Sequence, residues 1–169
     1  YHYPAHLEGN FDPDVSLGAP TPPEKARTFD WTEHFPKSTT VLAGIRAVVS
    51  PETQIHYAQG CTTSGTDTAG FTAAVEAANK AEVAVVVIGD KSGLARGCTC
   101  GESHDSATLN LPGVQQQLVE AIIATGTPTV VVLLSGRPYA IQWIADNVPA
   151  LLEAWLPAQE GGAAIADVL

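Results

Sequence analysis

Two apolar runs limit most strongly what this chain can fold into. Residues 83–88 and 128–134 consist mostly of valine, isoleucine and leucine. Each run is too short to cross a membrane, and such continuous β-branched runs are typical of strands buried on both faces of a parallel sheet. A third, mostly apolar stretch at 150–156 has a similar length. We therefore expect these three segments to form the centre of a parallel sheet.

Stretches with apolar residues at helical spacing lie before, between and after these runs. They predict helices over residues 38–50, 69–80, 112–125, 141–146 and 159–169. The alternating stretch at 54–59 predicts one further short strand. Strands that alternate with helices indicate an α/β fold, here a mostly parallel, doubly wound sheet with helices on both faces.

The N-terminal part of the sequence has a different character. Residues 1–37 contain six prolines and no sustained helical or strand period. We interpret them as an extended, Pro-rich arm that precedes an α/β domain over residues 38–169. The chain contains no methionine, and its last predicted helix reaches Leu169 without a cap. These features lead us to expect a domain that is truncated at both ends.

Composition excludes several classes of function. Eight lysines and arginines against eighteen acidic residues give a net charge of −10, so we expect no nucleic-acid partner. No apolar run is long enough for a membrane span, and no secretory signal opens the chain. Three cysteines are too few for a disulfide framework, which favours a cytoplasmic location but leaves secretion open.

The polar loop at 90–105 carries most of the chemically capable side chains. In a doubly wound sheet the loops that follow the strands meet at one edge, where ligands gather. This loop follows the strand predicted at 83–88 and is rich in glycine. Its candidate site residues are Asp90, Arg96, Glu102, His104 and Asp105.

Three other chemistries are conceivable for a loop of this composition. Cys98, Cys100 and His104 lie close together, and Cys61 can complete four zinc ligands, but free thiols without metal are the expected state. The glycine spacing matches neither nucleotide-binding motif. No G-x-S-x-G nucleophile motif is present, which argues against a serine hydrolase. Glu102 follows Gly101 on this loop. A glutamate held near apolar or anionic groups can have a raised pKa and act as a general acid.

Two sequence motifs resemble a known enzyme family. Residues 101–115 read G-E-S-H-D-S-A-T-L-N-L-P-G-V-Q, which is similar to the G-E-G-x-D-R-x-x-L-x-L-P-G-x-Q pattern of glycoside hydrolase family 3. The end of the chain, 155–169, resembles the family pattern W-x-P-G-Q-E-G-G-x-A-x-A-D-V-L. The chain departs from the first pattern at Ser103 and Ser106. The resemblance extends over residues 38–169.

The resemblance implies a C-terminal α/β-sandwich domain of a retaining β-glucosidase or β-xylosidase. Glu102 would be its acid/base, and the nucleophilic aspartate would lie on a TIM-like barrel domain earlier in the parent chain. The substrate would be a terminal β-linked glucose or xylose, with no cofactor, and the isolated chain would be inactive. The family's first strand would precede Tyr1. The alternatives are a non-catalytic module that shapes a sugar-binding cleft, and a small metal- or nucleotide-binding domain.

Overall fold

The computed structural model describes residues 37–93, 98–102 and 104–169. The N-terminal arm predicted at 1–37 and the candidate Arg96 therefore lie, apart from Lys37, outside the described residues. Apart from the strand predicted at 54–59, the helices and strands follow the predicted order along the chain. They are α2 (Val41–Val48), α3 (Phe71–Asn79), β1 (Ala84–Gly89), α4 (Gln115–Ile123), β2 (Thr129–Leu134), α5 (Gln142–Asn147), β3 (Ala150–Glu153) and α6 (Gly161–Val168).

The three predicted core strands form one parallel sheet in the order β1-β2-β3. β1 pairs with β2 from Ala84↔Thr129 to Gly89↔Leu134. β2 pairs with β3 from Val130↔Ala150 to Leu133↔Glu153. All three strands run in one direction, so their carboxyl ends lie at one edge of the sheet. The parallel sheet predicted from the apolar runs is confirmed.

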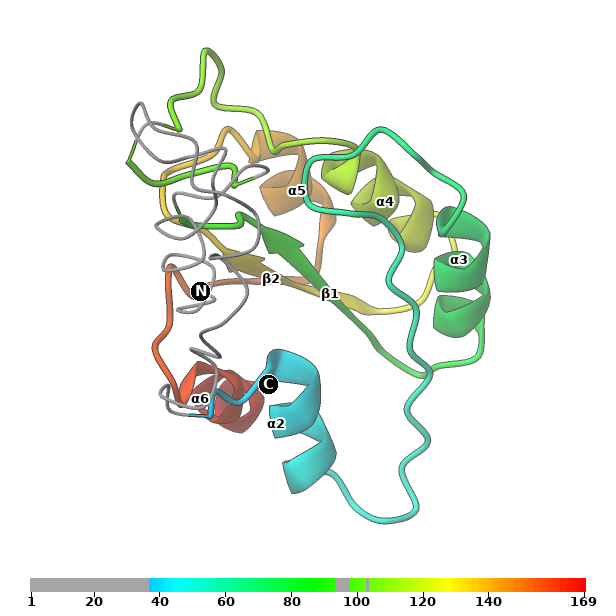
Figure 1. Cartoon of the computed structure of the whole chain (residues 1–169). Helices are drawn as coiled ribbons and strands as arrows, with labels where there is room; N and C mark the ends of the chain where they lie inside the picture. Colours follow the sequence, from blue (N-terminus) through cyan, green and yellow to red (C-terminus); the bar gives the residue numbers. More distant parts are fainter. Residues whose placement is uncertain (1–36, 94–97, 103) are drawn as a thin grey trace, which may run out of the picture.

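Helices cover both faces of the sheet (Figure 1). On one face, α3, α4 and α5 pack over Val131 and Leu133 of β2. On the other face, Val132 packs against Val41 of α2 and Ile165 of α6. Successive side chains of a strand point to opposite faces, which explains why the continuous apolar run of β2 fills both cores. The α/β class with helices on both faces is therefore confirmed.

The α2–α6 pair depends on small residues. Thr40 caps α2 by accepting a hydrogen bond from the Ala43 amide at 3.1 Å. A Cβ placed on Gly44 would lie 2.1 Å from the carbonyl oxygen of Gly162, so only glycine permits this approach of the two helices. The Gly162 amide donates to the Thr39 carbonyl at 3.1 Å. These contacts fix the start of α6 beside the start of α2.

The strand predicted at 54–59 is not formed. This segment has no regular secondary structure, and the edge of β1 away from β2 pairs with no described residue. A groove of about 390 Å³ separates the two, lined among others by Ile55, Tyr57 and Val85. Alternating apolar residues favour an extended backbone, but a strand also needs a neighbour about 4.8 Å away to accept its hydrogen bonds. The prediction of a strand at 54–59 was wrong because this segment has no neighbouring strand to pair with among the described residues.

Candidate functional site

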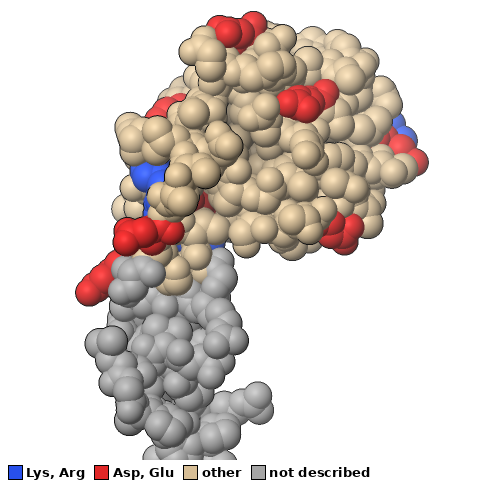
Figure 2. Space-filling model, turned by 90° about the horizontal axis from the view of Figure 1, so that it is seen from above, with Lys and Arg blue, Asp and Glu red and all other residues tan. Residues whose placement is uncertain are grey.

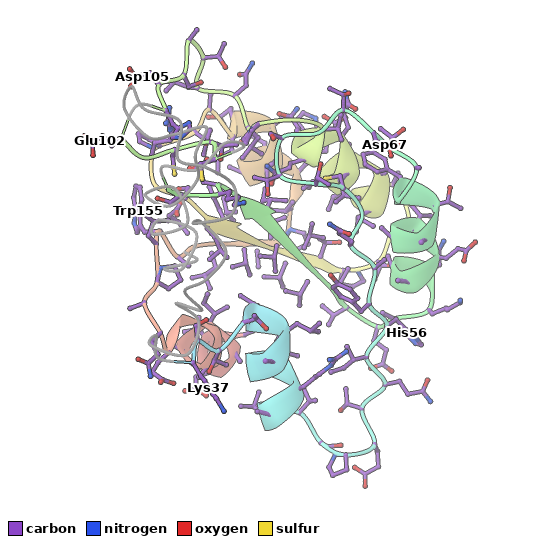
Figure 3. The ribbon with its side chains drawn as sticks, in the orientation of Figure 1. Lys37, His56, Asp67, Glu102, Asp105 and Trp155 are labelled. Atoms are coloured by element: carbon purple, nitrogen blue, oxygen red, sulfur yellow. The ribbon has the colours of Figure 1, made fainter. Side chains whose placement is uncertain are left out.

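The candidate site lies at the edge where the parallel strands end. Glu102, Asp105 and Trp155 lie at this side of the molecule, ahead of the arrowheads of β1 and β2 (Figure 3). Asp90 directly follows β1, and Ser135 directly follows β2. The sheet therefore brings the loops after its strands together, as the doubly wound topology predicts.

Glu102 is exposed, and its side chain points away from the body of the domain (Figure 3). It belongs to the Glu102 loop, residues 98–105, of which the structure describes all but 103. Asp105 is also exposed, whereas His104 is half-buried. The His104 amide donates to the Gly101 carbonyl at 3.2 Å, and its own carbonyl accepts from Arg137 Nη2 at 2.5 Å. The structure thus places two carboxylates at the surface and uses the His104 backbone to hold the loop.

Asp90 is surrounded by donors from the protein itself. Its Oδ1 accepts hydrogen bonds from Thr99 Oγ1 at 2.9 Å and from the Tyr139 hydroxyl. Its Oδ2 accepts from the Gly136 amide at 3.0 Å. Thr99 Oγ1 in turn accepts from the Lys91 amide at 2.9 Å. One carboxylate therefore links the end of β1, the Glu102 loop and the turn after β2.

Tyr139 is a member of this network that the sequence did not reveal. Burial raises the pKa of its phenol above the ordinary value, and the hydrogen bond to Asp90 and the charge of that carboxylate raise it further. The phenol therefore keeps its proton and remains a donor to Asp90 at neutral pH. The only available signal was its place, three residues after Gly136 at the end of a predicted strand.

Gln115 is a second residue that sequence reasoning passed over. It is a buried polar side chain at the start of α4. Its Oε1 accepts from the Gly89 amide at 2.6 Å, and its Nε2 donates to the carbonyls of Gly89 and Thr63 at 2.8 Å each. A buried amide with all its partners present rigidifies the structure around it. Gln115 therefore joins the end of β1 to the loop before α3.

The three cysteines are free thiols that are buried or half-buried. Cys98 and Cys100 are buried and free, and Cys61 is half-buried and free. Burial raises the pKa of the Cys61 and Cys100 thiols, which disfavours the thiolate that metal binding and nucleophilic attack require. No group of three or more His, Cys, Asp or Glu residues suited to a metal occurs within the described part of the chain.

The surface charge and the length of the helices concern two classes of partner, nucleic acids and membranes. The face shown in Figure 2 carries Asp and Glu side chains at several separate places and few Lys or Arg side chains. A surface of this kind does not attract a polyanion. None of the helices in the described ranges is long and apolar enough to cross a membrane.

Trp155 marks the end of β3 with an unusual backbone. Its φ of 52° is the one positive value at a non-glycine position among the described residues, and 55% of its surface is exposed. Its amide donates to Glu153 Oε1 at 2.8 Å, and its carbonyl accepts from the Ser135 amide at 3.0 Å. These bonds stabilise a conformation that β-forming residues ordinarily avoid, which explains why β3 ends earlier than predicted.

Comparison with known proteins identifies the architecture. The family model of the glycosyl hydrolase family 3 C-terminal domain matches residues 16–169. A β-xylosidase of Formosa agariphila is 41% identical over 134 residues, which are 79% of this chain and 18% of that protein. A periplasmic β-glucosidase of Salmonella typhimurium is 35% identical over 153 residues, with 79% of this chain and 19% of that protein covered.

Solved structures agree with these sequence relatives. The GH3 exo-β-xylosidase XlnD, in complex with a xylobiose aziridine activity-based probe, superposes with a TM-score of 0.69 at 29% identity. The alignment covers 79% of this chain and 16% of that structure. A β-glucosidase of Listeria innocua in complex with gluconolactone gives 0.63 at 28% identity, over 78% and 17% of the two chains. The chain therefore spans about a fifth of the length of the proteins it matches.

Proposed function

Since the chain belongs to glycoside hydrolase family 3, whose C-terminal domain it contains, we propose that it is the α/β sandwich of a retaining β-glycosidase. The relatives named above are β-xylosidases and β-glucosidases, which supports a terminal β-linked xylose or glucose as the sugar released. The matched proteins are about five times longer, which supports a further domain in the parent enzyme. In this proposal that domain is a TIM-like barrel that carries the nucleophilic aspartate.

Glu102 is proposed as the general acid/base of this enzyme. The observation that carries the proposal is the exposed position of Glu102 on a hydrogen-bonded loop at the edge where the parallel strands end, which is where ligands bind in sheets of this kind. A carboxyl group in this place can meet a sugar bound between this domain and a second one. In retaining hydrolysis it protonates the departing oxygen and then removes a proton from water, about 5–5.5 Å from the nucleophilic carboxylate.

We propose different roles for the remaining candidate residues. Asp105 is exposed three residues from Glu102 and is proposed to bind a sugar hydroxyl. Asp90 and His104 already engage protein groups through the Asp90 carboxylate and the His104 backbone. Arg96 stays a candidate for substrate binding on sequence grounds. The proposal includes no cofactor, because general acid/base and nucleophilic carboxylates are sufficient for this reaction.

The test is Glu102→Gln in the full-length enzyme. General acid/base catalysis is worth about 10²–10⁴-fold, so hydrolysis of substrates with poor leaving groups should fall by that factor. Aryl glycosides with good leaving groups need little protonation, so their first step should persist while deglycosylation becomes limiting. Azide attacks without a base and should restore turnover of these substrates.

Glu76→Gln on α3 is the matched control, since Glu76 is an exposed glutamate on a helix away from this edge. It should leave kcat and KM unchanged for every substrate. A loss below about tenfold for Glu102→Gln on all substrates would assign the acid/base role to another residue.

The 169-residue chain alone should show no turnover, because the proposal places the nucleophile outside it. Turnover that depends on Glu102 would contradict that placement.

A further inference from the structure

The Glu102 loop is attached to the domain on both sides of Glu102. Before Glu102, the Thr99 amide donates to the Lys91 carbonyl at 2.8 Å, and the Gly93 amide donates to the Cys100 carbonyl at 3.1 Å. After Glu102, Arg137 Nη2 donates to the His104 carbonyl at 2.5 Å. Attachments on both sides of Glu102 restrict where the backbone of this residue can lie.

Both attachments lead to the same turn after β2. Arg137 belongs to that turn and makes the second attachment directly. The first attachment reaches the turn through Asp90, which binds Thr99 on one side and the Gly136 amide and Tyr139 hydroxyl on the other. Cys100 adds a packing contact, because a Cβ on Gly136 would lie 2.7 Å from its sulfur. The turn at 135–139 is therefore the common support of the loop.

Asp90 is well placed for a supporting role. Its two carboxylate oxygens accept three hydrogen bonds from protein groups, one from the Glu102 loop and two from the turn at 135–139. Hydrogen bonds to a charged acceptor are shorter and stronger than neutral ones. The Tyr139 hydroxyl is the side-chain donor that ties this carboxylate to the turn. Its loss would leave the carboxylate with less restraint on Thr99 and on the loop beyond it.

We infer that Asp90 and Tyr139 are positioning residues that hold Glu102 at the distance from substrate at which it can transfer a proton. The inference rests on the proposed role of Glu102 as acid/base. Neither side chain needs to touch the sugar, since both act through the backbone of the Glu102 loop. A displacement of about 1 Å at a catalytic group can cost a large part of its contribution, which gives such support a measurable effect.

The first experiment removes one hydroxyl. Tyr139→Phe in the full-length enzyme should lower kcat at least tenfold on a substrate with a poor leaving group. Tyr139→Phe should change KM much less, and it should also change the rate of the first step much less for substrates with a good leaving group. Neither quantity depends on protonation of the leaving group. Tyr57→Phe is the matched control, since it removes the hydroxyl of an exposed tyrosine that belongs to the segment at 54–59. It should change neither parameter.

The second part of this experiment combines variants. If Tyr139 acts through Glu102, adding Tyr139→Phe to Glu102→Gln should cause no further loss. Losses that multiply would overturn the inference, because Tyr139 would then act independently of Glu102. An unchanged kcat in the single Tyr139→Phe variant would also overturn it. If Glu102→Gln alone has no leaving-group dependence, the proposed function fails, which is a separate result.

A measurement on the 169-residue chain tests, independently of catalysis, whether these hydrogen bonds hold the Glu102 loop. In a Cys61→Ala background, the buried Cys98 and Cys100 report opening of the loop through their rate of labelling by a thiol reagent. Tyr139→Phe and Thr99→Val should each raise that rate about 5-fold or more. Equal rates in wild type and both variants would show that these hydrogen bonds do not hold the loop, and would overturn the inference even if Glu102 is the acid/base.

Discussion

The Glu102 loop and the segment at 54–59 both lie beside β1, but they differ in how firmly hydrogen bonds attach them to the rest of the domain. The loop has no strand pattern, yet the Asp90 side chain binds it at Thr99, before Glu102, and the Arg137 side chain binds it at His104, after Glu102. The segment has the alternation of a strand, yet it forms no ladder, and a groove separates it from β1. Tyr57, in the middle of the segment, is 64% exposed.

The difference shows that local pattern and restraint are separate properties. Alternation of apolar residues determines which backbone conformation a segment prefers, but the partner that accepts its hydrogen bonds comes from elsewhere in the chain. A polar loop can be held more firmly than an apolar segment when its hydrogen-bonding groups find buried partners. Substitutions in the loop should therefore affect stability far more than substitutions in the segment.

The largest effect should come from Asp90→Ala. The change removes the acceptor of three hydrogen bonds and leaves the Tyr139 hydroxyl and the Gly136 amide without their partner. Each hydrogen bond to a charged group contributes about 1.5–3 kcal/mol, and the bonds are not additive, so we expect a loss of about 3–4 kcal/mol. Urea unfolding followed by circular dichroism measures the change.

Asp90→Asn is the control for that experiment, since it preserves the shape and one acceptor oxygen. We expect it to lose about half as much stability as Asp90→Ala. A loss below about 1 kcal/mol for Asp90→Ala would mean that water replaces the carboxylate without cost, and the loop would then be no better restrained than the segment at 54–59.

A smaller effect is expected at Gly101, directly before Glu102. Its φ is 120°, and a Cβ there would lie 2.6 Å from the Gly93 carbonyl oxygen. Gly101→Ala should therefore cost about 2–3 kcal/mol, from backbone strain and from the clash together. Gly126→Ala separates the two causes, because Gly126 has a φ of 79° with no atom within 4 Å of its Cβ position. It should cost only about 1–2 kcal/mol.

Thermal unfolding of the two glycine variants gives the comparison. A greater loss for Gly101→Ala than for Gly126→Ala indicates that the loop packs closely against residues 91–93. Equal losses would contradict that packing, because strain alone would then account for both. The larger loss should also raise the labelling rate of Cys98 and Cys100, which share the loop with Gly101.

The elements of the core could be predicted because their signals are local. The aliphatic run of β2 contains residues that are buried on both faces, such as Val131 and Val132, so the run itself indicates a central strand. The helix after Pro112 and the glycine at 126 follow from preferences at helix ends. The predicted strand at 54–59 failed because strand pairing depends on a distant neighbour.

The site could be predicted only in part. The family motif suggested Glu102, whose catalytic role stays a proposal, and the topology predicted that its loop and the turn at Arg137 lie at one edge. The pairing of Asp90 with Tyr139, 49 positions apart, has no local signal, since a tyrosine after a turn is ordinarily a surface residue. The same holds for Gln115, whose partners lie 26 and 52 positions away. Contacts of this kind follow from the packed structure and not from a pattern.

The smallest effect should come from the segment itself. Tyr57→Ala removes a large apolar side chain, which at a buried position costs about 3–5 kcal/mol. Because most of the Tyr57 surface is exposed beside the groove, we expect a change within about 0.5 kcal/mol in urea unfolding of the 169-residue chain. Ala58→Gly is the control within the same segment, since Ala58 packs against the core and should be more sensitive per atom removed. A loss above about 1.5 kcal/mol for Tyr57→Ala would show that the groove is closed in solution, and the two regions beside β1 would then be restrained alike.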